Sequence, residues 1–122
     1  MITIPKGNNE EAKKEFNNAI ADEFKIIMLV FGDNENIRQI LTDAEMCVKK
    51  VSPSRQLVWM QNTDFLTDNE KNEIYKIGNY VVCVLDKNKK PLVFLNEDEC
   101  KSIRKLEKAF TFAQKNGETN EN

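Results

Sequence analysis

Polar and apolar residues follow a helical period in several stretches of the chain. Apolar side chains recur there every three to four residues, which places them on one face of a helix while the other face stays polar. The predicted helices run over residues 10–23, from 37 to just before Ser52, over 68–76, and from an Asn96 cap to Gly117. Each helix needs a surface against which to bury its apolar stripe.

Short apolar runs between these stretches predict strands. The run within Phe24–Phe31 has no polar break, which is typical of a central strand covered on both faces. Gln56–Gln61 predicts a second buried strand, in which the neighbours Trp59 and Met60 should face opposite sides and pack in the core. Ile2–Pro5 predicts a short edge strand that ends at its proline.

The C-terminal half predicts a β-hairpin. Tyr80–Leu85 and Leu92–Leu95 are apolar runs separated by a short polar connection, so the two strands should pair antiparallel. Pro91 cannot donate a backbone hydrogen bond, which places the second strand on a sheet edge. The tip of the hairpin would carry three charged residues, Lys87, Lys89 and Lys90.

The order of these elements predicts one α/β domain over residues 1–117, followed by a polar tail over 118–122. We expect a central mixed sheet of four to five strands flanked by about four helices. Two side-chain pairs, Thr67 with Glu70 and Asn96 with Glu99, are spaced as in helix capping boxes.

Composition narrows the possible functions. The net charge is −2 and the charged residues are interspersed, so no broad basic face is expected to bind nucleic acid. No apolar run approaches the roughly 20 residues that span a bilayer, and no signal-peptide pattern is present, so we expect a cytoplasmic protein outside the membrane. Cys47, Cys83 and Cys100 are odd in number and widely spaced, which predicts free thiols in a reducing compartment.

The chain contains no histidine. Histidine is the usual general base near neutral pH and the commonest nitrogen ligand for metals, so Ser-His or Cys-His triads and imidazole zinc sites are excluded. No glycine-rich phosphate loop occurs, and no cofactor is expected. Asp33 and Glu35 are interpreted as a polar turn before a helix, where acids complement the helix dipole, rather than as metal ligands.

Two motifs and the order of elements resemble the thioredoxin family. Residues 75–82, Tyr-Lys-Ile-Gly-Asn-Tyr-Val-Val, are similar to the family's Tyr-x-Val-x-Gly-x-Pro-Thr lead into its third core strand. Residues 84–91, Val-Leu-Asp-Lys-Asn-Lys-Lys-Pro, are similar to its hairpin of the type Leu-Asp-Lys-x-Gly-Lys-Pro. The element order extends the resemblance over the whole chain and implies a thioredoxin-like fold.

The chain departs from that family at the positions that carry its chemistry. Counting from Phe31, the two redox cysteines fall at Asn36 and Gln39, and the buried acid falls at Val30. The family's cis-proline falls near Val81, where a cis bond would cost about 3 kcal/mol, so a trans bond is expected. Thiol–disulfide exchange needs an attacking thiolate and a resolving partner. The resemblance therefore implies a divergent member without thioredoxin-type oxidoreductase activity.

The first hypothesis about function is a redox-inactive protein-binding or structural module. The resemblance implies a groove for extended peptides between the loops at 32–39 and 78–81. Its candidate residues are Asn36, Gln39, Asn79, Tyr80 and Val81. The edge strand Leu92–Leu95 is the competing place for a protein partner, but Pro91 and the lysines beside it are typical of edge protection.

Two other hypotheses belong to different classes. A single-thiol protein linked to glutathione would use Cys100, where a helix N-terminus lowers a thiol pKa. Three acids precede Cys100 and it lies on an apolar stripe, so we interpret it as a core residue. A component of a larger assembly, such as that of a virus or phage, is suggested by the richness in Asn, Lys, Ile and Glu.

Overall fold

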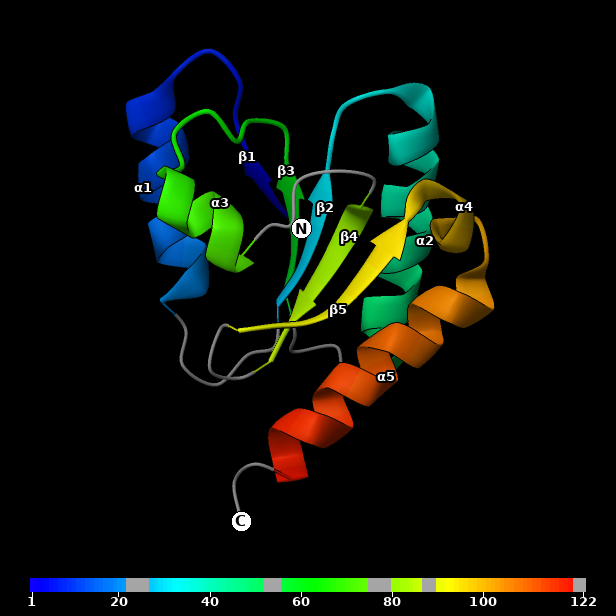
Figure 1. Ribbon diagram of the computed structural model, residues 1–122. Coiled ribbons are helices and arrows are strands. Elements are labelled where there is room, and N and C mark those ends of the chain that lie inside the picture. Colours follow the sequence, from blue (N-terminus) through cyan, green and yellow to red (C-terminus); the bar gives the residue numbers. More distant parts are fainter. Residues whose placement is uncertain (22–26, 52–55, 75–79, 87–89, 120–122) are drawn as a thin grey trace.

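The described residues of the computed structural model form a five-stranded mixed sheet (Figure 1). They comprise residues 1–21, 27–51, 56–74, 80–86 and 90–119. The strands are β1 (Ile2–Ile4), β2 (Ile27–Phe31), β3 (Gln56–Met60), β4 (Tyr80–Leu85) and β5 (Pro91–Asn96). Their order across the sheet is β1-β3-β2-β4-β5. The first three are mutually parallel, whereas β4 is antiparallel to both β2 and β5.

Helices cover both faces of this sheet (Figure 1). One face carries α1 (Asn9–Ile20) and α3 (Asp68–Ile74), and the other carries α2 (Glu35–Val51) and α5 (Ile103–Thr119). The short helix α4 (Glu97–Cys100) joins β5 to α5. Within the described residues, no helix combines the length and the apolar character needed to cross a membrane.

Two apolar cores, one on each face, hold the layers together. The α2/α5 core combines the buried stripes of those helices with Met28, Val30, Leu57, Val82, Val84 and Leu95 of the sheet. The α1 core consists of Ile4, Ala12, Phe16, Ala19, Leu29, Val58, Met60, Leu66, Cys83 and Leu85. Burying each large apolar side chain contributes about 1.5–3 kcal/mol, so the two cores supply the main stabilisation.

The central strand is β2, as its apolar run predicts. Met28 and Val30 lie in the α2/α5 core and Leu29 in the α1 core, and all three are fully buried. Parallel pairing with β3 and antiparallel pairing with β4 supply backbone partners on both sides. The prediction is confirmed for the residues from 27 onward, and residues 24–26 lie outside the described part.

The edge positions are also confirmed. β1 and β5 are the outer strands, and β4 with β5 form the predicted antiparallel hairpin. Met60 lies in the α1 core and Trp59 packs against the α2/α5 core, so these neighbours do face opposite sides. Of the predicted hairpin tip, Lys87 and Lys89 fall outside the described residues, and Lys90 is exposed.

The β4–β5 ribbon contains two irregularities that change where side chains point. Tyr80 pairs with Asn96 and Val82 with Leu95, so β4 holds one extra residue, Val81. Val81 and Val82 consequently both face the α2/α5 core, and Tyr80 turns to the other face, where its ring lies 5.0 Å from that of Phe94. A β-bulge re-aims side chains in this way.

Both predicted capping boxes are present. The backbone nitrogen of Glu70 donates to Thr67 Oγ1 (3.1 Å), and that of Thr67 donates to Glu70 Oε1 (3.0 Å). The same reciprocal pair joins Asn96 and Glu99 at 2.8 and 3.0 Å. The first box starts α3, which is described as far as Ile74. The predicted end near residue 76 lies outside the described residues.

The C-terminal helix differs from its prediction. Asn96 caps only α4. A second helix, α5, starts after Ser102, whose Oγ accepts from the backbone nitrogen of Lys105 at 3.3 Å. Ile103 therefore opens a new helix and is 43% exposed instead of lying on the buried stripe. At the other end, α5 continues past Gly117 to Thr119. Glycine weakens a helix by about 1 kcal/mol but does not have to end it.

Candidate functional site

The carboxyl ends of β1, β2 and β3 meet at one edge of the sheet, because the three strands are parallel. From this edge β2 leads to α2 on one face, and its neighbour β3 leads to α3 on the opposite face (Figure 1). Open α/β sheets place ligands at such a switch point, outside the carboxyl ends of the strands. The topology therefore makes this edge the candidate site.

Gly32 makes the turn from β2 into the site. Its φ of +105° is a conformation that L side chains rarely adopt, and a Cβ there would lie 3.2 Å from Ile37 Cγ1. Its backbone nitrogen donates to the Met60 carbonyl (3.3 Å), and its carbonyl accepts from Trp59 Nε1 (2.7 Å). The turn is thereby fixed to the end of β3.

Asp33 follows the turn and joins two cations from different elements. Its carboxylate forms an ion pair with Lys6, from the loop after β1, and a second with Arg38 of α2, at 3.2 Å from Nη2. The Asp33 side chain is 16% exposed. The Lys6 ammonium, aided by Arg38, holds the pKa of the Asp33 carboxyl below its usual value, although burial of the carboxyl opposes this.

Arg38 also lies over the ring of Trp59, with Cζ 5.9 Å from the ring centroid. A guanidinium over an indole face is a favourable cation–π arrangement. The sequence analysis missed this cluster, because its members come from separate segments that meet only through parallel pairing. The available signal was that Lys6 and Asp33 lie just after two predicted strands and that Trp59 lies near the end of a third.

The start of α2 carries two of the predicted groove residues. Asn34 caps the helix, since its Oδ1 accepts from the backbone nitrogen of Ile37 at 2.9 Å. Asn36 is exposed in the first turn. Gln39 is also exposed, and its Nε2 donates to Asp43 Oδ1 at 3.3 Å, along the helix. Asn34 was not singled out by the sequence analysis, although an asparagine just before an apolar stripe is a cap signal.

The other predicted groove residues belong to the start of β4. Val30 pairs with Val82, so the antiparallel register brings Tyr80 and Val81 to the edge from which Gly32 emerges. Tyr80 is 41% exposed, whereas Val81 packs against the α2/α5 core. Asn79 lies outside the described residues.

Two hollows flank the sheet ends. One of about 530 Å³ adjoins the Asp33 cluster and is lined by Lys6, Gly7, Asn9, Gln61, Asn62, Thr63 and Asp64. Asn62 is buried beside it, donating to Asn9 Oδ1 (2.9 Å) and accepting from the Asp64 backbone nitrogen (2.9 Å). Its amide therefore fixes the shape of the loop after β3.

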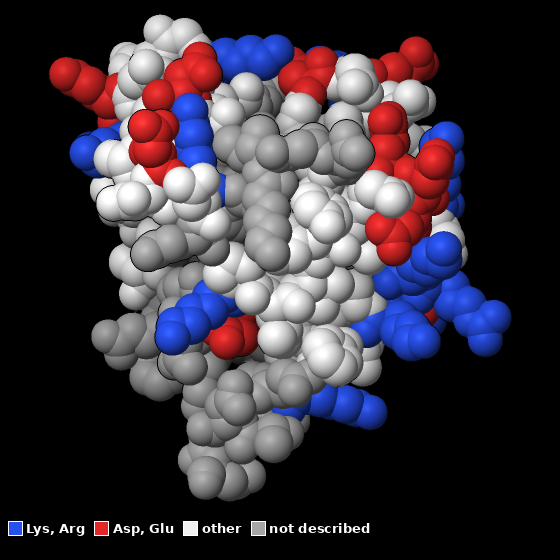
Figure 2. Space-filling model, viewed as in Figure 1, with Lys and Arg blue, Asp and Glu red and all other residues white. Residues whose placement is uncertain are grey.

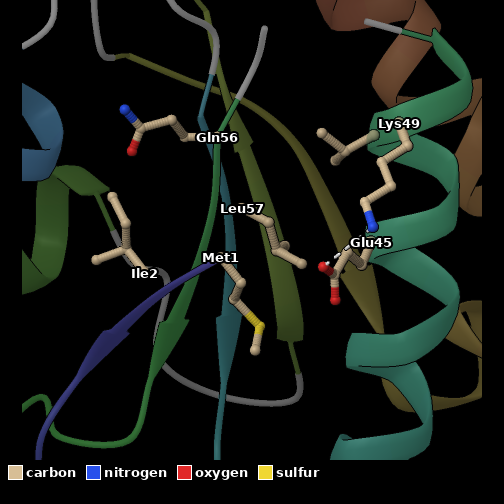
Figure 3. A pocket seen from close by; sticks show the side chains of 7 residues that line it. Met1, Ile2, Glu45, Lys49, Gln56 and Leu57 are labelled. Carbon is tan, nitrogen blue, oxygen red and sulfur yellow. Dashed lines mark ion pairs between the residues drawn. The ribbon is translucent and has the colours of Figure 1, made fainter. Parts of the chain in front are cut away.

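The second hollow, of about 310 Å³, lies at the opposite end of the sheet (Figure 3). Met1 and Leu57 point toward α2, where Glu45 and Lys49 pair with each other at 3.6 Å. The side chain of Gln56 points away from that helix. Because the two charges on its wall neutralise each other, this hollow offers less for a ligand to recognise than the edge around Asp33.

The three thiols are buried in the two cores, as predicted. Burial, with Glu99 and Glu97 nearby, raises the pKa of Cys100 to about 12. Burial raises the pKa of Cys83 to about 12 and, with Glu107 and Asp43 adding to it, that of Cys47 to about 11. Cys100 is the last residue of α4, so it does not gain the helix N-terminus that a reactive thiol would use.

No group of three His, Cys, Asp or Glu side chains is arranged to hold a metal ion within the described ranges. The peptide bonds there, including that between Tyr80 and Val81, are trans. Comparison with protein-family models, with curated proteins and with solved structures finds no match for this chain.

Replacing Gly32 by alanine should destabilise the protein by about 1–3 kcal/mol, because the new Cβ meets Ile37 in a conformation that alanine avoids. Gly7→Ala is the matched control: Gly7 also has a positive φ, but a Cβ added there would meet nothing within 4 Å. The Gly7→Ala variant should lose less of the free energy of unfolding, about 1 kcal/mol. Urea unfolding of both variants measures the difference, and equal losses would contradict the crowding at Gly32.

Asp33→Asn should lower the free energy of unfolding at neutral pH, because it removes the carboxylate between Lys6 and Arg38. The pKa of Asp33 is depressed in the folded state, so its contribution is present above the unfolded pKa of about 3.9 and is lost as pH falls through the folded value. The difference between wild type and variant should therefore shrink below about pH 4. Glu35→Gln, in the first turn of α2, is the control. A pH-independent difference would argue against the ion pairs.

Proposed function

We propose that this chain is a thioredoxin-like, redox-inactive module that binds an extended segment of a protein partner. The binding groove lies where α2 and β4 begin. The observation that carries the proposal is the β2–β4 register, which brings exposed Tyr80 to the edge from which the chain enters α2. Asn36, exposed in the first turn of that helix, offers a side-chain amide at the same edge.

The fold assignment within this proposal rests on the order of elements. Strand, helix, strand, helix, strand, helix and a terminal hairpin followed by helix is the order that carries the resemblance to thioredoxins. It is supported by the meeting of the α2 start and the β4 start at one sheet edge.

The chemistry of the edge favours recognition over reaction. An amide side chain and an aromatic ring hold extended backbone by hydrogen bonds and packing. The one carboxylate of the cluster, that of Asp33, is engaged by both Lys6 and Arg38, so it is not poised to act as a base on a substrate. Three free, buried thiols suit a reducing compartment such as the cytoplasm.

The thiols provide a test against the single-thiol alternative. With pKa values of about 11 to 12, all three should stay unreactive toward a maleimide at about pH 8 in the folded protein and react after denaturation. The protein should likewise not accelerate the reduction of insulin by dithiothreitol. Labelling of Cys100 in the native protein below about pH 8 would contradict this expectation and would favour the single-thiol function.

The groove can be tested with peptides selected from a displayed library of short random sequences. Replacing Tyr80 and Asn36 together by alanine should weaken binding of the selected peptides by at least ~1 kcal/mol, about fivefold, as measured by calorimetry. Phe112→Ala is the matched control, since Phe112 is another exposed aromatic residue, 51% accessible, on α5.

Equal binding by the double variant and the wild type, with both folded by circular dichroism, would place recognition elsewhere. Loss of binding on changing Leu92 to Leu95 would then move the site to the edge strand.

A further inference from the structure

We propose that two copies of this chain associate through β5, pairing antiparallel about a twofold axis so that the two sheets join. The proposal concerns the edge of the sheet and does not depend on the peptide groove. It rests on the composition of β5, on the charges at its two ends and on the position of Phe94.

The outer side of β5 pairs with no other strand among the described residues. No helix or strand crosses the viewed face of β5 in Figure 1, and Figure 2 shows an uncharged surface over the middle of β4 and β5 in the same view. Natural sheet edges are guarded by charged side chains, by proline or by bulges. In β5 the proline and the irregularity opposite Leu85 lie at the start of the strand, and the rest of Pro91–Asn96 carries no charged side chain.

The charges at the two ends of β5 are opposite. The segment 86–90 contains three lysines and one aspartate, whereas 97–101 contains two glutamates, one aspartate and one lysine. Antiparallel pairing places the basic end of one copy against the acidic end of the other, twice per dimer. Parallel pairing would instead bring like charges together, which electrostatic complementarity disfavours.

Phe94 is the natural position for the twofold axis. In a symmetric antiparallel pair one residue faces its own copy, and Lys90 lies four residues before Phe94 while Asp98 lies four after it. This register brings Lys90, just before β5, close to the start of α4 of the second copy, the helix that carries Asp98. Lys90 is exposed, and the Asp98 side chain is 90% exposed, with Lys101 at 3.3 Å as a weak surface partner.

The same register extends an aromatic contact across the interface. Tyr80 and Phe94 already lie 5.0 Å apart on one face. Phe94 opposite its own copy would continue this pair into a row of four rings, and aromatic cross-strand pairs stabilise sheets. The association closes as a dimer, because the far edge of each sheet is the three-residue strand β1, which is too short to recruit further copies.

The test is a charge exchange, measured by analytical ultracentrifugation from about 1 µM to about 1 mM, the range of weak specific complexes. Lys90→Glu and Asp98→Lys should each raise the dimer dissociation constant about tenfold, because each places two like-charged pairs in the interface. An equimolar mixture of these two variants should recover the wild-type dissociation constant, since every pair is then opposite in sign. The doubly exchanged chain should recover it as well.

Recovery on mixing is specific to contact between copies. Within one chain, Lys90 and Asp98 flank a six-residue strand, and its length of roughly 20 Å prevents their direct contact. Lys13→Glu on α1 is the matched control, because it makes the same change of net charge on the helix that packs against β1, at the opposite edge. It should leave the dissociation constant unchanged.

Two results would overturn the proposal. One is a monomeric wild-type chain over the whole concentration range. The other is a dimer whose dissociation constant is the same in Lys90→Glu, in Lys13→Glu and in the wild type, because its interface would then lie elsewhere. The proposed peptide groove would survive either result, since Asn36 tests the groove and takes no part in the β5 interface.

Discussion

Burial of β2 on both faces constrains the rest of the molecule. Its side chains alternate between the α1 core and the α2/α5 core, so a helical layer is needed on each side of the sheet. Its backbone needs partners on both edges, and β3 and β4 provide them in opposite orientations. The end of β2 therefore emerges between a parallel and an antiparallel neighbour, and this fixes where the candidate site lies.

The polar residues at that end fix the turn at Gly32 and pair the charge of Asp33. Gly32 has a positive φ close to Ile37, and its carbonyl accepts from the indole nitrogen of Trp59. Asp33 is held between two cations in the next position. In the proposed function, recognition of a partner therefore falls to uncharged side chains at the same edge, such as Asn36 and Tyr80.

The sequence predicted what depends on local pattern and failed where the outcome depends on tertiary contacts. The central strand, the hairpin and both capping boxes follow from periodicity or from residue spacing, and all are present. The break at Ser102 was missed, because the apolar spacing runs through it and only its hydroxyl cap marks the new start. The re-aiming of Tyr80 could not be foreseen either, since a bulge is a property of the pairing of two strands.

The same limit applies to the candidate site. Asn36 and Gln39 were predicted by counting from Phe31 along the thioredoxin pattern, and both lie in the first half of α2. Lys6, Arg38 and Trp59 were not found, because nothing in their local sequence links them before the parallel strands bring their ends together. Sequence spacing thus located the loop that borders the site, and strand pairing determined which side chains surround it.

Tyr80 connects the two surfaces proposed for this chain. The extra residue in β4 turns its ring away from the α2/α5 core and toward Phe94, so the ring borders both the groove and the outer strand. A peptide that packed on Tyr80 would therefore also touch the start of the aromatic row that crosses the β5 interface. Asn36 belongs to the groove alone and Lys90 to the strand edge alone. The bulge at Val81 therefore places Tyr80 in both of the proposed surfaces.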